Sequence, residues 1–127
     1  MIKFQRITTK DATLYNYMEQ LMTASFPSEE YRPLEELRNY TDTKTHFYCN
    51  IILHHDTPVG FITYWDFGHF YYVEHFAIDP SLRNGGHGKN VLNHLCQQLN
   101  KPIILEAEMP EEEMAIRRIN FYKRHGF

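Results

Sequence analysis

Three consecutive stretches rich in aromatic and β-branched residues dominate the middle of this chain, at residues 46–54, 59–67 and 70–78. Residues of these kinds favour an extended backbone. The polar segment HDTP at residues 55–58 separates the first two stretches and is typical of a turn, and Gly68 interrupts the pattern before the third. We therefore expect three successive strands that pair as an antiparallel meander.

The residues before the meander predict one strand and two helices. The alternation at residues 2–8 indicates a short strand. Apolar residues then recur at helical spacing, with Asp11 or Thr9 placed to cap the helix and the prolines of residues 26–33 placed to end it. The apolar stripe of this helix comprises Leu14, Tyr17, Met18, Leu21 and Met22. A second, shorter helix is expected at residues 34–40.

The residues after the meander predict a further helix, a strand and a closing helix. Apolar positions within residues 91–99 indicate a helix that Pro102 ends, and residues 103–109 form a strand before a helix at 111–124. A strand-helix-strand passage is nearly always right-handed and makes its two strands parallel neighbours. We expect one domain of mixed α/β class over residues 1–127.

Charge and cysteine content narrow the functional classes. The 127 residues include 13 basic and 16 acidic side chains, a formal net charge of −3, which argues against general attraction to nucleic acid or to an anionic membrane. No stretch reaches the about 18 apolar residues that span a membrane. Cys49 and Cys96 lie in apolar runs, where cysteine usually packs as a small core residue. A reduced, cytoplasmic setting is expected.

A glycine-rich segment between a predicted strand and a predicted helix is the most informative motif. It consists of Arg83, Asn84, Gly85, Gly86, His87, Gly88 and Lys89. The first N–H groups of a helix lack partners within the helix and carry partial positive charge, so they attract phosphate oxygens. Glycines let the backbone approach such an anion, and Arg83 and Lys89 add positive charge. The segment predicts a phosphate or pyrophosphate site, although glycines here could also serve a simple turn.

Two well-known nucleotide-binding patterns do not fit this segment. The Walker pattern requires GxxxxGK followed by Ser or Thr, and neither feature is present. The Rossmann pattern requires GxGxxG after the first strand of a βαβ series, whereas this segment follows the fourth predicted strand and reads RxxGxG. Nucleotidyl transfer and hydride transfer are therefore not favoured.

RxxGxG after FAIDP resembles the acetyl-CoA loop of GNAT-type N-acetyltransferases. The segment AIRRINFYKRHGF at residues 115–127 is similar to the closing helix of that family, with an FY pair followed by GF. The resemblance covers essentially the whole chain and implies a splayed mixed sheet flanked by helices, with acetyl-CoA between strands 70–78 and 103–109. It implies that main-chain groups of Phe76, Ala77 and Ile78 pair with the pantetheine arm. The N–H groups of residues 84–89, with the Arg83 side chain nearby, would hold the pyrophosphate.

The resemblance also implies direct attack of a primary amine, from a small molecule or a peptide, on the acetyl thioester. An ammonium group must first lose a proton, and the departing thiolate profits from an acid. Tyr122, in the FY pair, matches the acid position, although a tyrosine on an apolar helix face can also simply pack. The candidate bases are Glu74 and then Glu106, either of which could instead face water, and a base acting through a water is a further alternative.

Alternation places Glu74 on one face of its strand with Tyr72, Phe76 and Ile78, and His75 on the opposite face. The eight histidines of the chain raise the question of a metal site. Neither His54 with His55 nor His69 with His75 has the spacing of a zinc motif, so no metal is expected.

The chain departs from the GNAT pattern at its C-terminal end. Family members usually continue beyond GF with two more strands, whereas this sequence stops at Phe127. Strand 103–109 would then have an unpaired edge, which invites pairing with another copy as a homodimer, or a loss of stability. Three interpretations remain open: an N-acetyltransferase, a CoA-binding or regulatory module without turnover, and a structural domain whose glycine segment is only a turn.

Overall fold

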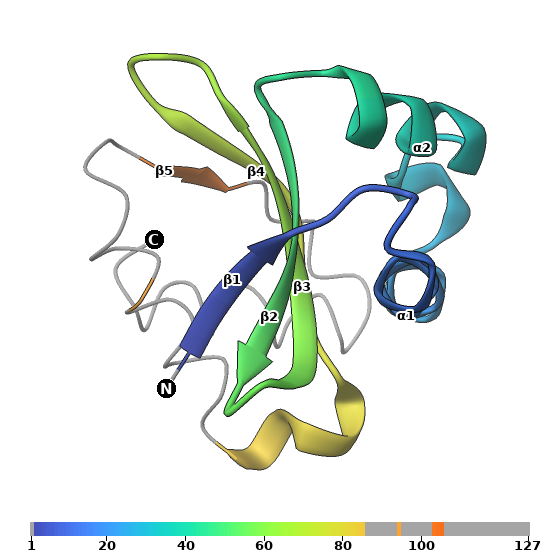
Figure 1. Cartoon of the computed structure of the whole chain (residues 1–127), viewed down its shortest axis with the longest axis vertical. Coiled ribbons are helices and arrows are strands. Elements are labelled where there is room, and N and C mark those ends of the chain that lie inside the picture. The colour runs from blue at the N-terminus through green and yellow to red at the C-terminus, as the bar shows by residue number, and fades with distance from the viewer. Residues whose placement is uncertain (1, 86–93, 95–102, 106–127) are drawn as a thin grey trace.

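The computed structural model describes residues 2–85, 94 and 103–105. Within these residues, the elements whose bounds the structure gives are two α-helices, five strands and two short 3₁₀-helices, η1 and η2 (Figure 1). In chain order the elements are β1 (Ile2–Arg6), α1 (Ala12–Ser25), η1 (Ser28–Glu30), α2 (Leu34–Thr43), β2 (Phe47–His54), β3 (Thr57–Asp66), β4 (Tyr71–Ile78), η2 (Pro80–Gly85) and β5 (Ile103–Leu105).

The described strands form one sheet in the order β1-β2-β3-β4-β5. The first four strands pair antiparallel, and β5 pairs parallel to β4. Helices α1 and α2 lie together on one face of this sheet (Figure 1). The antiparallel meander, the parallel pairing of its last strand and the mixed α/β class are thus confirmed.

The β2–β3 connection is tighter than the sequence predicts. His55 and Asp56 both have positive φ, 51° and 65°, and they alone join the paired residues His54 and Thr57. Two positive φ angles in a two-residue loop match the twist of the flanking strands. The HDTP prediction was right about the turn but wrong about its extent, because β3 already begins at Thr57.

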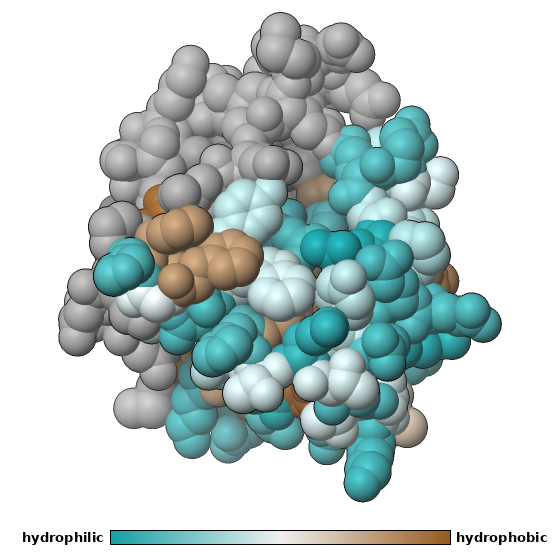
Figure 2. Space-filling view, turned by 90° about the horizontal axis from the view of Figure 1, so that it is seen from above, coloured by the Kyte–Doolittle hydropathy of each residue, from teal (hydrophilic) through white to brown (hydrophobic). Residues whose placement is uncertain are grey.

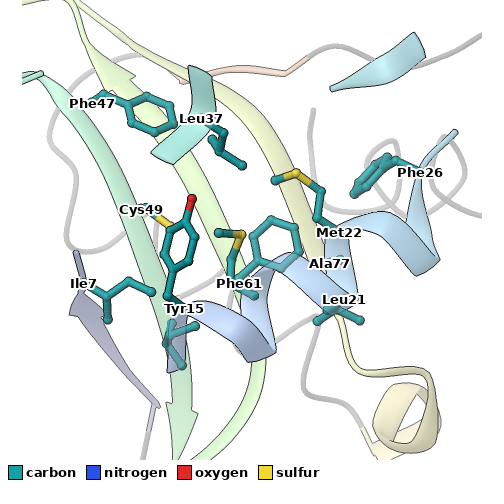
Figure 3. Packing of buried hydrophobic residues seen from close by; sticks show 12 residues of the cluster. Ile7, Tyr15, Leu21, Met22, Phe26, Leu37, Phe47, Cys49, Phe61 and Ala77 are labelled. Carbon is teal, nitrogen blue, oxygen red and sulfur yellow. The ribbon is translucent and has the colours of Figure 1, made fainter. Parts of the chain in front are cut away.

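Helix α1 packs an apolar stripe onto the sheet (Figure 3). Met18, Leu21 and Met22 are buried as predicted, and Tyr15, which the sequence did not single out, is buried with them. The cluster beneath the helices, here called the helix-side cluster, comprises Ile7, Tyr15, Met18, Leu21, Met22, Phe26, Leu37, Phe47, Cys49, Ile51, Phe61 and Ala77. Cys49 is a free, buried thiol, as expected of a small core residue.

The start of α1 differs from the prediction. Asp11 occupies the position before the helix, but its side chain makes no capping hydrogen bond to it. The Asp11 carboxylate accepts from the Thr8 N–H at 2.9 Å, and Thr9 donates from both its N–H and its hydroxyl to Asp42. These bonds from Thr9 lower the pKa of Asp42. Both candidate caps therefore stabilise the loop before the helix, and the prediction of a side-chain cap was wrong.

The opposite face of the sheet carries a second apolar cluster. Its buried members are Ile2, Ile52, Val59, Ile62, Tyr64, Val73, Phe76 and Ile78. His94, which is helical, packs edge-on against Phe4 of β1 with the ring centroids 5.1 Å apart. Apart from His94, the helix expected at 91–99 lies outside the described residues, as do residues 106–109 of the predicted strand and the helix at 111–124.

Candidate active site

Strand β4 contains a β-bulge at Glu74. Thr63 of β3 pairs with His75, but the next residue, Tyr64, pairs with Val73, so Glu74 has no partner in this register. A bulge inserts one residue and changes the facing of the side chains on either side of it. Strict alternation along 70–78 is therefore broken in the middle of the strand.

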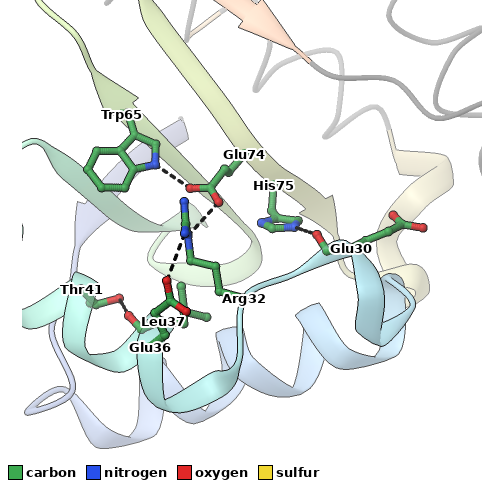
Figure 4. Close-up of polar contacts among 8 residues, drawn as sticks. All are labelled: Glu30, Arg32, Glu36, Leu37, Thr41, Trp65, Glu74 and His75. Carbon is green, nitrogen blue, oxygen red and sulfur yellow. Dashed lines mark hydrogen bonds and ion pairs between the residues drawn. The ribbon is translucent and has the colours of Figure 1, made fainter.

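The bulge turns two consecutive side chains toward the helices (Figure 4). His75 packs against Phe26 of the helix-side cluster, with the ring centroids 4.9 Å apart, and Glu74 meets Arg32. Phe76 and Ile78 are buried on the other face. The expectation that Glu74 shares a face with Phe76 and Ile78, and that His75 points the opposite way, was therefore wrong.

Both carboxylate oxygens of Glu74 have partners. The indole Nε1 of Trp65 donates to Oε2 at 2.6 Å, and Arg32 Nε forms an ion pair with Oε1 at 3.1 Å (Figure 4). The Glu74 side chain is only 14% exposed. A buried carboxylate needs such partners because desolvation disfavours its charge. Glu74 thus lines the helix side of β4 as a carboxylate with both oxygens engaged.

Arg32 lies between carboxylates and aromatic rings. A second ion pair joins its Nη1 to Glu36 Oε1 at 3.3 Å, one helical turn further along. The guanidinium also lies over the ring of Tyr40, 4.6 Å from the centroid, and 5.9 Å from that of Trp65. Each of these contacts favours a cation at this position.

His75 holds the same connecting segment from its neighbouring position. Its Nε2 lies 2.8 Å from the carbonyl oxygen of Glu30, and since a carbonyl can only accept, Nε2–H donates. Glu30 ends η1, two residues before Arg32. The two bulge residues therefore both contact residues 30–32, at the end of η1 and directly after it.

Glu74, Arg32, Trp65 and His75 are here called the polar group. The β3–β4 connection lies close to it. Phe67 stacks on Trp65 with the ring planes 3° apart and is 51% exposed. The Gly68 N–H donates to Asp66 Oδ1, and the φ of Gly68, +89°, is readily adopted only by glycine. Figure 2 views the molecule from above and shows a small group of hydrophobic residues next to hydrophilic ones.

In the C-terminal half of β4, the main-chain N–H and C=O groups of successive residues point alternately toward β3 and toward the β5 side. Asp79 N–H donates to Val59 O at 2.8 Å, which makes these two residues a hydrogen-bonded pair. Such pairs alternate along an antiparallel ladder, so Ala77 also bonds toward β3, whereas the main-chain groups of Phe76 and Ile78 point to the β5 side. The described pairing of β4 with β5 covers Tyr71 to Val73.

Gly60 lets β3 approach β4 closely beside these residues. A Cβ at this position would collide with the carbonyl oxygen of Ala77, which is a main-chain atom and cannot swing aside. A side chain at Gly60 would therefore push β3 and β4 apart where Phe76 to Ile78 lie.

Asp79 shapes the exit from β4. Its Oδ1 accepts from both the N–H and the hydroxyl of Ser81, and its Oδ2 accepts from the Tyr17 hydroxyl at 3.4 Å. Burial, followed by the Asp79 charge, raises the pKa of Tyr17 to about 12, so this phenol keeps its proton. The chain then forms η2 rather than an open loop, and η2 contains Arg83, Asn84 and Gly85.

The remaining predicted site residues lie outside the described residues. They are Gly86, His87, Gly88 and Lys89 of the glycine-rich segment, and the catalytic candidates Glu106 and Tyr122. In the part of the chain that the structure describes, no group of three or more His, Cys, Asp or Glu side chains could hold a metal ion. In the same part, no helix is both long and apolar enough to cross a membrane.

Sequence reasoning missed Arg32, Trp65 and Asp79. Arg32 is 42 positions before Glu74 and lies among other charged residues, so no local pattern connects the two. Trp65 was assigned only to a strand. Asp79 had a usable signal, because an Asp before Pro-Ser commonly accepts main-chain bonds in a turn.

Comparisons with known proteins show which protein family the chain belongs to. The profile of the acetyltransferase (GNAT) family matches residues 12–127. A protein from Bacteroides thetaiotaomicron, whose name assigns it to the GNAT family of acetyltransferases, is 63% identical, with a TM-score of 0.91 over 98% of this chain and 70% of that one. A comparison with curated protein sequences finds no significant match.

More distant structures share the fold. An aminoglycoside acetyltransferase from an uncultured soil metagenomic sample has a TM-score of 0.70 at 17% identity, over 99% of this chain and 88% of that one. The ribosomal-protein-S18-alanine N-acetyltransferase of Escherichia coli has a TM-score of 0.69 at 18% identity, over 99% and 77%. The chain belongs to the GNAT family of acetyltransferases, and its class of enzyme is acyltransferase.

Proposed function

We propose that this chain transfers the acetyl group of acetyl-CoA to a primary amine of a small molecule or a peptide, with residues 1–127 acting as one domain. The observation that carries the proposal is the end of β4. There the main-chain groups of Phe76 and Ile78 face the β5 side, and the chain leads directly into the glycine-rich segment. Membership of the GNAT family supports acetyl-CoA as the donor.

In this proposal the pantetheine arm pairs with β4 as an added strand would. Phe76 and Ile78 supply the main-chain groups, while Ala77, whose own groups bond toward β3, lines the strand between them. The N–H groups of residues 84–89 hold the diphosphate, with the Arg83 side chain nearby. Asp79 supports this arrangement by fixing the turn from which that segment starts.

The proposed reaction is a direct displacement. A carboxylate removes a proton from the acceptor ammonium, the amine nitrogen attacks the thioester carbonyl carbon, and the carbon–sulfur bond breaks. Tyr122 returns a proton to the departing sulfur. Glu74 is the first candidate base because its carboxylate is largely shielded on the helix side of β4, and Glu106 is the second.

The proposal specifies the acceptor only as a primary amine. Relatives of the same fold act on aminoglycosides in one case and on a ribosomal protein's alanine in another. A panel of amino sugars, polyamines, small amines and peptides is therefore the appropriate starting point. Pairing with a second copy along the β5 edge remains a prediction that size measurement in solution would test.

A second candidate function is a CoA-binding module without turnover. The engagement of both Glu74 oxygens by Arg32 and Trp65 favours it, since a carboxylate already held by two partners can serve structure alone. A binding measurement tests both candidates together, and a turnover assay separates them. Acetyl-CoA at 100 times its dissociation constant should add about 2.7 kcal/mol to the free energy of unfolding in both cases. Release of free CoA thiol with any amine of the panel is expected only of the enzyme.

Two variants test the assigned roles. Gly86→Val should abolish the stabilisation by CoA, because a branched side chain blocks the diphosphate, and unchanged CoA binding would place the phosphates elsewhere. Tyr122→Phe should lower turnover while CoA affinity is kept, and equal rates at every pH would exclude the acid role.

A further inference from the structure

The β-bulge leaves the direction of the Glu74 side chain to be set by neighbours. Residues on either side of it are fixed by pairing with β3, but Glu74 itself has no partner in the register. An unpaired, bulged residue has a less constrained backbone than its neighbours. Whatever holds its carboxylate therefore determines where the charge points.

Two groups from different elements hold that carboxylate. Trp65 comes from β3, the neighbouring strand, and donates to one oxygen. Arg32 comes from the segment before α2 and pairs with the other oxygen. The two contacts approach different oxygens, one as a hydrogen bond and the other as an ion pair, so the indole N–H and the guanidinium charge together favour this orientation of the carboxylate.

Arg32 is itself fixed on several sides. Glu36 pairs with it from α2, the Tyr40 ring lies beneath its guanidinium, and Pro33 follows it in the chain. Its side chain is 31% exposed, so solvent screens these contacts only in part. A long side chain held in this way loses little further freedom on binding a carboxylate.

We propose that Arg32 is a positioning residue for Glu74. It holds the carboxylate against the Trp65 indole, so that the acceptor amine meets a base of fixed orientation, and it does not itself contact the substrate. This inference rests on the proposed function, in which Glu74 accepts the amine proton. Displacing a reacting group by a fraction of its contact distance costs rate rather than binding.

The single tryptophan of the chain provides a direct readout, because its indole N–H gives one resonance in a ¹H–¹⁵N spectrum. Glu74→Gln should move this resonance upfield, because the hydrogen bond to a charged acceptor is lost. Arg32→Gln should move it the same way, and Arg32→Lys, which keeps the charge, should restore most of the shift. The matched control is Arg38→Gln, which removes the arginine of another ion pair of α2 and should leave the resonance in place.

A double variant separates positioning from direct contact, since Arg32 also lies 5.9 Å from the Trp65 ring. If Arg32 acts through Glu74, Arg32→Gln adds no further shift in the Glu74→Gln background. An undiminished shift in that background, or no shift from Arg32→Gln alone, overturns the proposal.

Steady-state kinetics provide a second test of the role of Arg32. Arg32→Gln should lower kcat about ten-fold with the KM for acetyl-CoA unchanged, Arg32→Lys should recover most of it, and the loss should vanish in the Glu74→Gln background. Unchanged turnover in Arg32→Gln overturns the proposal. If the wild-type chain binds acetyl-CoA but acetylates no amine, the proposed enzyme function fails, and the indole resonance still decides whether Arg32 fixes the carboxylate.

Discussion

Two regions on the same face of the sheet are built in opposite ways. The helix-side cluster under α1 and α2 is apolar, and Met18, Met22, Ile51 and Phe61 within it are completely buried. The second region lies beside this cluster, around the bulge, and consists of Glu74, Arg32, Trp65 and His75. These residues are held by hydrogen bonds and ion pairs (Figure 4).

The two regions are expected to contribute differently to stability and to activity. Burial of apolar surface stabilises the fold in proportion to the area removed from water. Half-buried charges contribute much less, because pairing must first offset their desolvation. We therefore expect changes in the helix-side cluster to lower stability, and changes around the bulge to lower activity at nearly constant stability.

The largest stability effect is expected from Phe61→Ala. Phe61 is fully buried between the helices and the sheet, so its removal leaves a cavity and should cost about 3–5 kcal/mol. Urea unfolding gives this value directly. Phe67→Ala is the matched control, because Phe67 is the exposed phenylalanine beside the polar group and should cost less than about 1 kcal/mol. Equal losses in the two variants would remove the distinction between the regions.

A pH effect of intermediate size is expected above pH 9. Burial raises the pKa of the Cys49 thiol and of the Tyr64 phenol to about 12 in each case. Their ordinary values are 9.0 and 10.0, so above these values the unfolded chain loses protons that the folded chain keeps. Between pH 8 and 9 the free energy of unfolding should change little. Above pH 9 it should fall by about 1.4 kcal/mol per pH unit because of the thiol, and above pH 10 the Tyr64 phenol, together with that of Tyr17, should make the fall steeper.

Urea midpoints from pH 8 to 11 measure this slope. Cys49→Ala should be less stable than the wild type at pH 8, because it leaves a small cavity, but its stability should fall less steeply between pH 9 and 10. An identical slope in the variant would show that the thiol does not carry the effect.

Asp79→Ala should cost about 1 kcal/mol and weaken binding of CoA. The change removes three hydrogen-bond contacts, two with Ser81 and one from Tyr17, that set the turn before η2. Ser81→Ala keeps the main-chain bond and should show a smaller loss of CoA affinity. Calorimetric titration with CoA measures the affinity of the two variants. Wild-type affinity in Asp79→Ala would show that the turn held by Asp79 does not contribute to CoA binding.

The smallest effect is expected from Glu36→Gln. This carboxylate forms an exposed i,i+4 pair with Arg32, and such pairs contribute about 0.3–0.5 kcal/mol. The unfolding midpoint should hardly move, and Arg32 should keep its contact with Glu74. A large loss of stability here would mean that the polar group supports the fold as strongly as the apolar cluster does.

The sheet could be predicted from the sequence because each strand of the meander is a local run of aromatic and β-branched residues. The stretches at 46–54, 59–67 and 70–78 are interrupted by turn residues, and the parallel partner of β4 follows from the connectivity. The bulge escaped prediction because the alternation in YYVEHFAI is compatible with a regular strand. Only the register with β3 shows that Glu74 is the extra residue.

The candidate site was predictable in part for a similar reason. Motifs of adjacent residues identified the glycine-rich segment and the FY pair, whose roles remain predictions. The contact between Arg32 and Glu74 depends on how the segment before α2 lies on β4, and no local pattern encodes a pairing over that distance. Long-range polar contacts of this kind appear only once the fold is known.

Acetyl-CoA is proposed to bind along the β5 side of β4. A titration of the ¹⁵N-labelled chain with acetyl-CoA, followed through the main-chain amide resonances of Phe76, Ala77 and Ile78, tests it most directly. Large, saturable shifts are expected for Phe76 and Ile78 and a smaller one for Ala77, whose N–H bonds toward β3. No shift at Phe76 or Ile78 with acetyl-CoA at about 1 mM would contradict it.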